Sequence, residues 1–330
     1  MAWGLDQLVG DPQASPHPVV VMGWGINRLR RLTQNWGWHD PWRLRVAGTL
    51  ITLLIVGGAT GFGWLVERLL LSAGTPLFQL LGAALLVLGL ASALAARSLQ
   101  QAVQRVLTAL PDLPEARRRL SWIVGRDTAG LDEAQILRAL AETSSENGVD
   151  GLFAPLFWML IGALLWSLGF TAAPGPLALA WGFKAASTLD SMLGYRQGDL
   201  QWLGTAGARL DDALVWLPCR LTALSLPLAI GRPQQCGPLL RAALRDGQPD
   251  PSPNAGVSQA AYAHLVGVEL GGLNRYGGQL RSKPRLAAGC PPPDRAAVER
   301  MLAFNRRLSL LWIVTSGLIA TGMIVTKALS

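Results

Sequence analysis

Cysteine and histidine are scarce in this 330-residue chain, which contains three of each. They are Cys219, Cys236, Cys290, His17, His39 and His264. Cysteines so few and so scattered exclude a disulfide framework, and the spacing of the six residues is not that of a zinc site. Charged residues are also few, at 15% of the chain, whereas hydrophobic residues make up 50%. This composition excludes a disordered, collagen-like or coiled-coil protein and predicts an integral membrane protein.

The net charge of +8 comes mainly from arginine, because the chain has only three lysines among its 29 basic residues. The arginines flank apolar runs, as the positive-inside rule predicts for membrane proteins. No nucleic-acid-binding motif accompanies them, so we expect no nucleic-acid partner. Acidic residues and prolines near the start occupy the place of an apolar signal-peptide core, which argues against a cleavable signal peptide.

Five apolar segments are candidate membrane spans, since a spanning helix needs about 20 such residues. They are 46–66, 75–96, 152–170, 213–231 and 308–326. Pro174 and Pro176 separate 152–170 from a short apolar piece at 177–183, and Pro218 and Pro227 lie inside 213–231. These prolines predict either broken or re-entrant helices that line a cavity, or ordinary helices with kinks.

The loops between these segments differ in basic charge. Residues 97–150 carry seven lysines and arginines and residues 232–307 carry eleven, whereas the loop after the first span carries only Arg68. Both large loops are therefore expected to be cytoplasmic, with 232–307 a small helical subdomain. No sequence repeat is present. We predict one all-α domain over 1–330, a polytopic helical membrane bundle with cytoplasmic helical loops.

Acidic residues gather just before the third apolar segment. Arg138, Glu142, Glu146 and Asp150 recur every four residues, which places them on one stripe of a helix. Carboxylate oxygens at this spacing suit Mg²⁺, which binds through one or two carboxylates and phosphate oxygens. The alternative is a solvated helix face in which Arg138 pairs with Glu142.

Two more polar clusters adjoin apolar segments. The first runs from Lys184 through Thr188 and Asp190 to Ser191, and the second is Arg209-Leu210-Asp211-Asp212. Charged groups at membrane depth are costly and are commonly functional. Three clusters at three ends of apolar segments predict that acids and bases converge on one cytoplasmic-facing site.

Other segments give weaker signals. Asn254 is placed to begin a helix, whose free N–H groups could bind an anion. The paired glycines around Arg275, in 270–278, could let the backbone wrap a phosphate, although such glycines more often only form turns. His17 precedes the first span and is as a lone histidine more often structural than catalytic.

These blocks, in this order, resemble the CobD/CbiB family of cobalamin biosynthesis, the adenosylcobinamide-phosphate synthases. The resemblance extends over nearly the whole chain and includes Glu142-x-x-x-Glu146-Asn147-x-x-Asp150. The other matching blocks are 10–12, 17–18, 126–128, 154–157, 188–195, 208–212, 253–256 and 270–272. Ser187 departs from the family pattern, where asparagine is expected, so no ligand role is assigned to it.

The resemblance implies an ATP- and Mg²⁺-dependent amide ligation in the bacterial inner membrane. The substrates would be adenosylcobyric acid, which supplies a carboxylate, and (R)-1-amino-2-propanol or its O-phosphate, which supplies the amine. The membrane anchor would hold the enzyme beside other nucleotide-loop assembly enzymes. Two other classes are a membrane sensor like AmpE, which needs no catalytic acids, and a transporter, which the position of the polar residues at span ends disfavours.

We therefore expect four kinds of site residue. The Mg²⁺ ligands would be Glu142, Glu146, Asp150 and Asp127. The phosphate-binding residues would be Arg126, Lys184 and Arg209. The base that takes the amine proton would be Asp190, Asp211 or Asp212. The substrate contacts would come from His17, Asn147, Asn254 and Arg275.

Overall fold

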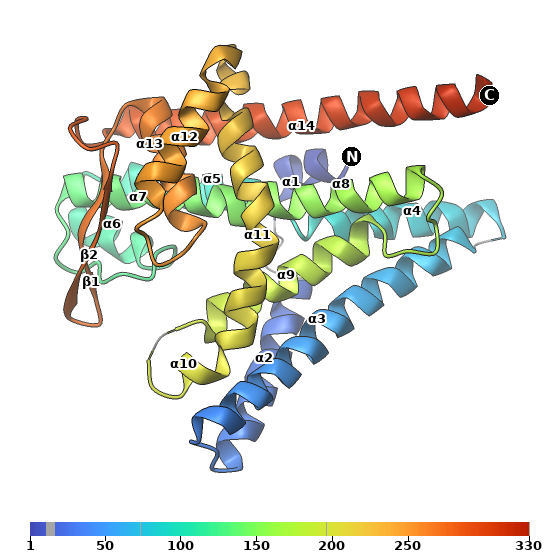
Figure 1. Ribbon diagram of the computed structural model, residues 1–330, viewed down its shortest axis with the longest axis horizontal. Helices are drawn as coiled ribbons and strands as arrows, with labels where there is room; N and C mark the ends of the chain where they lie inside the picture. Colours follow the sequence, from blue (N-terminus) through green and yellow to red (C-terminus); the bar gives the residue numbers. More distant parts are fainter. Residues whose placement is uncertain (11–16, 73, 196, 330) are drawn as a thin grey trace. The chain divides into compact units, whose positions relative to one another are not determined.

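The computed structural model describes residues 1–10, 17–72, 74–195 and 197–329, with the side chains of residue 9 and of 322–329 left out (Figure 1). Asp11 and Pro12 of the matching block 10–12 therefore lie outside the described residues. The N-terminal helices are α1 (Ala2–Val9), α2 (Pro18–Asn35), α3 (Pro41–Leu71), α4 (Pro76–Ala91), α5 (Ala96–Ala109), α6 (Leu113–Leu120) and α7 (Glu133–Gly148). A π-helical turn, η1 (Val149–Phe153), follows α7.

The remaining helices are α8 (Ala154–Ser167), α9 (Pro176–Leu193), α10 (Leu200–Leu203), α11 (Thr205–Ser225), α12 (Cys236–Gly247), α13 (Ala255–Val266) and α14 (Arg295–Leu329). Short 3₁₀ helices η2 (Leu226–Ile230) and η3 (Pro233–Gln235) and the strands β1 (Leu270–Tyr276) and β2 (Gln279–Leu286) complete the described chain. The sequence predicts one domain, and the structure divides into two compact units. Unit 1 comprises Met1–Ala95, Ala154–Leu214 and Ser316–Ser330, and unit 2 comprises Ala96–Phe153 and Val215–Thr315.

Unit 1 is built around α3, which packs against α2, α9 and α10. Its core contains Ile26, Leu44, Ile51, Leu189 and Leu203, all of them buried. Glycines on α3 permit the close approach of the neighbouring backbone, because a Cβ at position 48 would lie 1.9 Å from the Leu203 carbonyl oxygen. Small residues at helix contacts of this kind are typical of helix packing in membranes.

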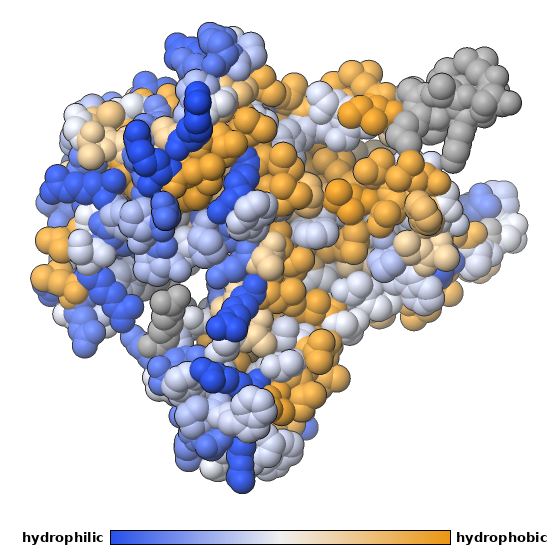
Figure 2. Space-filling view, in the orientation of Figure 1, coloured by the Kyte–Doolittle hydropathy of each residue, from blue (hydrophilic) through white to orange (hydrophobic). Residues whose placement is uncertain are grey.

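The outer surface of α3 is apolar. Leu50, Leu53, Leu54 and Phe62 are each more than half exposed, and Figure 2 shows hydrophobic side chains on the surface where Figure 1 draws the middle of α3. An exposed apolar face of this length suits contact with lipid. The protein is an all-α helical membrane protein, apart from one small hairpin in its described part.

Among the described residues, four helical stretches are long and apolar enough to cross a membrane. They are Pro41–Leu71, Pro76–Ala109, Glu133–Ser167 and Thr205–Ile230. Four of the five predicted segments, 46–66, 75–96, 152–170 and 213–231, overlap these stretches. The fifth, 308–326, lies within α14, and the side chains of its last residues are outside the described set.

The predicted break after 152–170 is present, since α8 ends at Ser167 and α9 begins at Pro176. Glu67 on α3 stabilises this break. Its fully buried carboxylate accepts hydrogen bonds from the N–H groups of Gly175 at 2.9 Å, Leu177 at 2.7 Å and Ala178 at 3.2 Å. These are the free N–H groups at the start of α9, so an anion from α3 satisfies the positive end of that helix.

The prolines in 213–231 behave differently from each other. The helix α11 continues through Pro218 without ending, whereas Pro227 lies in η2, where the α-helical geometry has given way to 3₁₀. The predicted interruption of this segment therefore occurs only near its end.

Unit 2 contains a β-hairpin where the sequence predicts only helices and loops. β1 and β2 pair antiparallel around Gly277 and Gly278, which both adopt positive φ as a tight two-residue turn requires. Gly271 lies at a bulge in β1, and a Cβ there would lie 1.9 Å from the Pro284 carbonyl oxygen. The paired glycines around Arg275 thus form a turn and a bulge.

Candidate functional site

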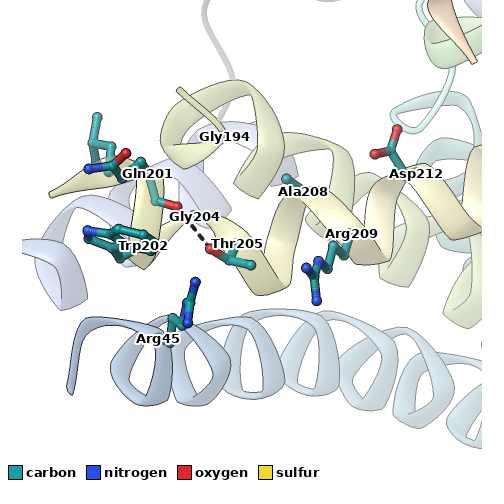
Figure 3. A pocket seen from close by; sticks show the side chains of 10 residues that line it. Arg45, Gly194, Gln201, Trp202, Gly204, Thr205, Ala208, Arg209 and Asp212 are labelled. Carbon is teal, nitrogen blue, oxygen red and sulfur yellow. Dashed lines mark hydrogen bonds between the residues drawn. The ribbon is translucent and has the colours of Figure 1, made fainter. Parts of the chain in front are cut away.

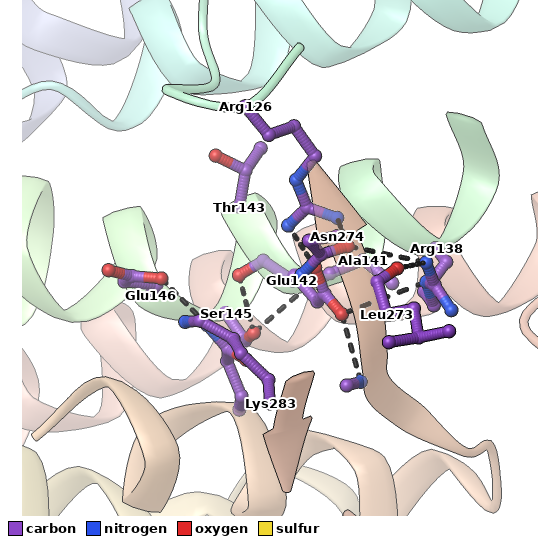
Figure 4. Close-up of polar contacts among 12 residues, drawn as sticks. Arg126, Arg138, Ala141, Glu142, Thr143, Ser145, Glu146, Leu273, Asn274 and Lys283 are labelled. Atoms are coloured by element: carbon purple, nitrogen blue, oxygen red, sulfur yellow. Dashed lines mark hydrogen bonds and ion pairs between the residues drawn. The ribbon is translucent and has the colours of Figure 1, made fainter. Parts of the chain in front are cut away.

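Unit 2 holds the predicted acidic stripe. A capping box of Asp132 and Gln135 begins α7, which carries Glu142 and Glu146, and η1 carries Asp150. Glu142 is only 1% exposed, and its carboxylate accepts hydrogen bonds from the Arg126 guanidinium and from the N–H of Gly271 at 2.9 Å (Figure 4). A buried carboxylate with these partners is fully engaged with the protein.

The arginines around Glu142 also bind the hairpin. Arg126 donates to the side-chain oxygen of Asn274 at 2.9 Å, and Arg138 donates to the Leu273 carbonyl at 2.8 Å. Arg138 lies 4.0 Å from Glu142, which agrees with the pairing considered from the sequence. Arg126 was predicted to bind phosphate, but its N–H groups donate to Glu142 on α7 and Asn274 on β1. In this structure Arg126 therefore links α7 to β1.

Glu146 belongs to a second buried group. It accepts a hydrogen bond from Gln259 at 2.7 Å, and Lys283 and Asp250 are its charged neighbours, with 3.4 Å between the Lys283 ammonium and Asp250. Burial alone would lower the pKa of Lys283, but the carboxylates of Glu146 and Asp250 outweigh it and raise that pKa. The sequence reasoning missed Lys283, although the scarcity of lysine in this chain could have drawn attention to it.

Asp127, the fourth predicted Mg²⁺ ligand, binds the hairpin turn. Its two oxygens accept hydrogen bonds from the N–H groups of Gly277 at 3.1 Å and Gly278 at 2.7 Å. In the part of the chain that the structure describes, no three His, Cys, Asp or Glu side chains lie where they could hold a metal ion together. Glu142 instead pairs with arginine and Asp127 with backbone N–H groups, and the Mg²⁺ assignment stays a prediction.

Asn254 begins α13, as predicted, but its side chain does not cap the helix. Its oxygen accepts a hydrogen bond from Arg220 at 2.8 Å, and the Ser252 hydroxyl accepts from the N–H groups of Asn254 and Ala255 at 3.3 and 3.2 Å. These contacts already use N–H groups that were predicted to bind an anion.

The other predicted substrate contacts are dispersed. In unit 2, Asn147 donates to the Thr143 hydroxyl at 2.9 Å, and Arg275 is exposed on β1. In unit 1, His17 occupies the N-cap of α2, where its ring accepts from the Val19 N–H at 3.3 Å. The position of His17 fits the structural reading of a lone histidine.

Unit 1 contains a separate acid–base cluster. Lys184 and Asp190 on α9 and Asp212 on α11 are the charged neighbours of Asp211. One carboxylate oxygen of Asp211 is buried and accepts no hydrogen bond from the described residues. The structure thus brings together the second and third polar clusters of the sequence within one unit.

A pocket of about 320 Å³ adjoins this cluster. It is lined by Arg45 from α3, by Trp202, and by Thr205, Arg209 and Asp212 from the first turns of α11 (Figure 3). Gly194 also lines it, and an oxygen of Asp190 lies so close that a Cβ at position 194 would be 2.1 Å away. Arg209 and Asp212 were predicted site residues, whereas Arg45 and Trp202 were not.

The comparison with protein families is decisive for identity. The family model described as CobD/Cbib protein matches residues 1–305, which include the polar groups of unit 1 and unit 2 and the pocket. The chain belongs to the CobD/CbiB family.

Related proteins match over nearly their whole length. A protein of Synechocystis sp. named cobalamin biosynthesis protein CobD is 41% identical, over 99% of this chain and 92% of its own. A CobD of Geobacter metallireducens is 38% identical, over 98% of this chain and 96% of its own. A protein of Salmonella typhimurium named cobalamin biosynthesis protein CbiB is 37% identical, over 96% of this chain and 92% of its own. No solved structure matches this CobD/CbiB chain.

Within this CobD/CbiB chain the two polar groups differ in character. The unit 2 carboxylates Glu142 and Asp127 are occupied by arginine and backbone N–H groups. The unit 1 group borders a pocket and keeps a buried carboxylate oxygen of Asp211 without a hydrogen bond from the described residues. Buried polar atoms without a hydrogen bond from the described residues also lie in unit 2, at Gln259 and Asn274, so it is the adjoining pocket that distinguishes the unit 1 group.

Proposed function

We propose that this chain is an ATP-dependent amide ligase of cobalamin biosynthesis, an adenosylcobinamide-phosphate synthase. It joins adenosylcobyric acid to (R)-1-amino-2-propanol or its O-phosphate. Family membership and the names of the relatives support the pathway. The observation that carries the reaction type is the cluster of Lys184, Asp190, Asp211 and Asp212 beside a pocket that contains two arginines.

Amide ligation driven by ATP needs both cationic and anionic side chains. A carboxylate does not react with an amine at neutral pH, because its oxygen is a poor leaving group. Attack of the carboxylate on the γ-phosphorus of ATP releases ADP and gives an acyl phosphate. The amine then attacks the acyl carbon, phosphate leaves with the former carboxylate oxygen, and the amine gives up a proton. Cationic side chains stabilise the phosphate charge, and a carboxylate accepts the proton.

The unit 1 residues suit these roles. Lys184 is a charged neighbour of Asp211 and is assigned to the phosphate oxygens of ATP. Arg209 lines the pocket and is assigned to a phosphate that binds there. Asp212 lines the same pocket and is assigned as the base for the amine proton. Asp211 lies beside Asp190 and Asp212, and its carboxylate holds Lys184 in place by charge.

Mg²⁺ belongs to the proposal as the usual partner of ATP. The four carboxylates first expected to bind it do not form a common ligand set, since Glu142 and Asp127 are engaged elsewhere. We therefore assign the ion no protein ligands and derive no step through it.

The membrane location follows from the same proposal. The apolar helices support a membrane location, which we propose to be the bacterial inner membrane. The arginine-rich segments 97–150 and 232–307 support large loops on the cytoplasmic side. There it would meet its corrinoid substrate and other enzymes of nucleotide-loop assembly.

The test uses the full chain purified into lipid nanodiscs. It is incubated with MgATP, adenosylcobyric acid and each form of the amino alcohol, and ADP and the amide product are measured together by mass spectrometry. The ligase produces ADP only when both other substrates are present, in equal amount to the amide. A folded preparation that binds a corrinoid or nucleotide but forms no amide would favour the sensor function considered from the sequence.

A further inference from the structure

Two arginines from different helices of unit 1 reach one pocket. Arg45 extends from the first turns of α3 and Arg209 from the first turns of α11, and both line the cavity of about 320 Å³ (Figure 3). Among the residues that the structure describes, no carboxylate forms an ion pair with either guanidinium. Both side chains are exposed, and two guanidinium groups that line one pocket without an ion-pair partner among the described residues favour an anionic ligand.

Trp202 fixes one of these arginines. The guanidinium carbon of Arg45 lies 4.5 Å from the centre of the Trp202 ring. Stacking on an aromatic face uses the flat surface of the guanidinium and leaves its N–H donors at the edge. A guanidinium held in this way is ready for a planar, bidentate contact with phosphate oxygens.

The same pocket has an acidic end. Asp212 lines it, and Asp190 lies against Gly194 in its wall. Figure 3 shows the carboxylate of Asp212 apart from the guanidinium groups of Arg45 and Arg209. The pocket therefore offers positive charge in one part and negative charge in another, which suits a ligand that carries both.

We propose that this pocket binds a small phosphomonoester that also carries an ammonium group, with the phosphate between Arg45 and Arg209 and the nitrogen toward Asp212. The inference rests on the proposed function and deepens it, because it identifies this ligand with the phosphorylated amino alcohol. The volume agrees, since about 320 Å³ is at the small end of the roughly 300–1,000 Å³ range of ligand pockets. A corrinoid is too large for it.

Two other sources of phosphate compete for this site. ATP carries phosphate groups, and anionic lipids present phosphate at the ends of membrane helices, where Arg45 and Arg209 lie in the chain. The test therefore separates the amino-alcohol phosphate from ATP and from lipid.

The experiment uses the full chain in nanodiscs of neutral phosphatidylcholine. Isothermal titration measures the binding of (R)-1-amino-2-propanol O-phosphate and of the unphosphorylated amine, with no ATP or corrinoid present. The variants are Arg45→Gln, Arg209→Gln and Arg45→Lys, which keeps the charge. Arg43→Gln is the matched control, because Arg43 is an exposed residue of α3 that does not line the pocket.

We expect Arg45→Gln and Arg209→Gln each to weaken binding of the phosphate ester about tenfold or more, because each removes charge-assisted hydrogen bonds. Arg45→Lys should weaken it less, and Arg43→Gln should leave it unchanged. In turnover the KM for the phosphate ester should rise in parallel, while the KM for ATP stays within about twofold of wild type.

Equal binding of the ester by wild type and both glutamine variants would overturn the inference. A rise in the KM for ATP alone in these variants would also overturn it. So would an effect of Arg45→Gln that is confined to the loss of thermal stabilisation by phosphatidylglycerol in the nanodisc. If the wild type binds the ester through Arg45 and Arg209 but makes no amide, the pocket assignment stands and the proposed ligase function fails.

Discussion

The carboxylate of Glu67 on α3 accepts a hydrogen bond of 2.7 Å from the N–H of Leu177 at the start of α9. Gly175 and Ala178 donate to the same carboxylate, which is fully buried. One acidic side chain thus stabilises the start of a helix that would otherwise expose free N–H groups to an apolar environment. Since α9 carries Lys184 and Asp190, Glu67 also positions the acid–base cluster.

Replacing Glu67 by alanine should therefore destabilise the protein. Loss of a charged acceptor leaves three buried N–H groups unsatisfied, each at a cost of about 1–3 kcal/mol in a folded protein. We expect Glu67→Ala to lower the midpoint of thermal unfolding by several degrees, measured in one detergent by tryptophan fluorescence. Glu299→Ala, which removes an exposed helical ion pair, should have little effect. Equal midpoints for the two variants would contradict this role of Glu67.

Glu142 should behave as a structural residue. The variant Glu142→Gln leaves the buried guanidinium of Arg126 without its counter-charge, so thermal stability should fall. Removing both charges, in Glu142→Gln with Arg126→Met, should restore part of the loss, because the unpaired charge is then absent. A stable Glu142→Gln variant that requires much more Mg²⁺ for half-maximal activity would instead return Glu142 to the metal site predicted from the sequence.

Asp212 should be required for turnover. Because it lines the pocket and is assigned to the amine proton, Asp212→Asn should lower kcat about 10²- to 10⁴-fold. The KM for ATP should change little, which separates loss of a base from loss of nucleotide binding. Asp199→Asn, an exposed aspartate paired with His39, serves as the control and should retain activity. Normal kcat in Asp212→Asn would require Asp190 or Asp211 as the base.

Acid should weaken the packing of α12 against α13. Burial raises the pKa of Asp246, but hydrogen bonds from Arg245, from His264 at 2.7 Å and from the Ala287 N–H outweigh it and lower that pKa. A carboxylate with a lowered pKa in the folded state stabilises the protein above its unfolded pKa, near 3.8, and loses this contribution as the pH falls below that value through the lower pKa of the folded state. Asp246→Asn should be less stable than wild type at pH 7, and the difference should shrink as the pH falls below about 4. If the unfolding midpoints of wild type and Asp246→Asn differ by the same amount from pH 7 to pH 3, the stabilisation does not come from the ionised carboxylate of Asp246.

The sequence predicts most of the helical fold because long apolar runs leave few alternatives. The break at Pro174 and Pro176 was also predicted from the sequence, because proline inside a helix removes a backbone hydrogen bond and disrupts the preceding turn. The hairpin around Gly277 was not predicted. Its strand β1 contains glycines, which are rare in strands, and a hairpin turn is recognised in a sequence only when both flanking strands are recognised. The role of Glu67 was also hidden, because its partners are N–H groups more than 100 residues away along the chain.

The candidate site was predicted in part. Lys184, Asp190, Asp211 and Asp212 were singled out by their position beside apolar segments, and the structure brings them together. Arg45 was not singled out, because arginines beside apolar runs are expected in a membrane protein and its partner Trp202 lies more than 150 residues away in the sequence. The acidic stripe of α7 had two interpretations, and only the positions of Arg126 and the hairpin show where Glu142 is engaged.

The most direct measurement for the proposed reaction follows the carboxylate oxygen. Adenosylcobyric acid labelled with ¹⁸O in its reacting carboxylate is incubated with the full chain, MgATP and the amine, and the released phosphate and nucleotide are examined by mass spectrometry. The ligase mechanism predicts that each molecule of inorganic phosphate carries one labelled oxygen and that the nucleotide is unlabelled ADP. Unlabelled phosphate, or label in AMP, would contradict the acyl-phosphate route.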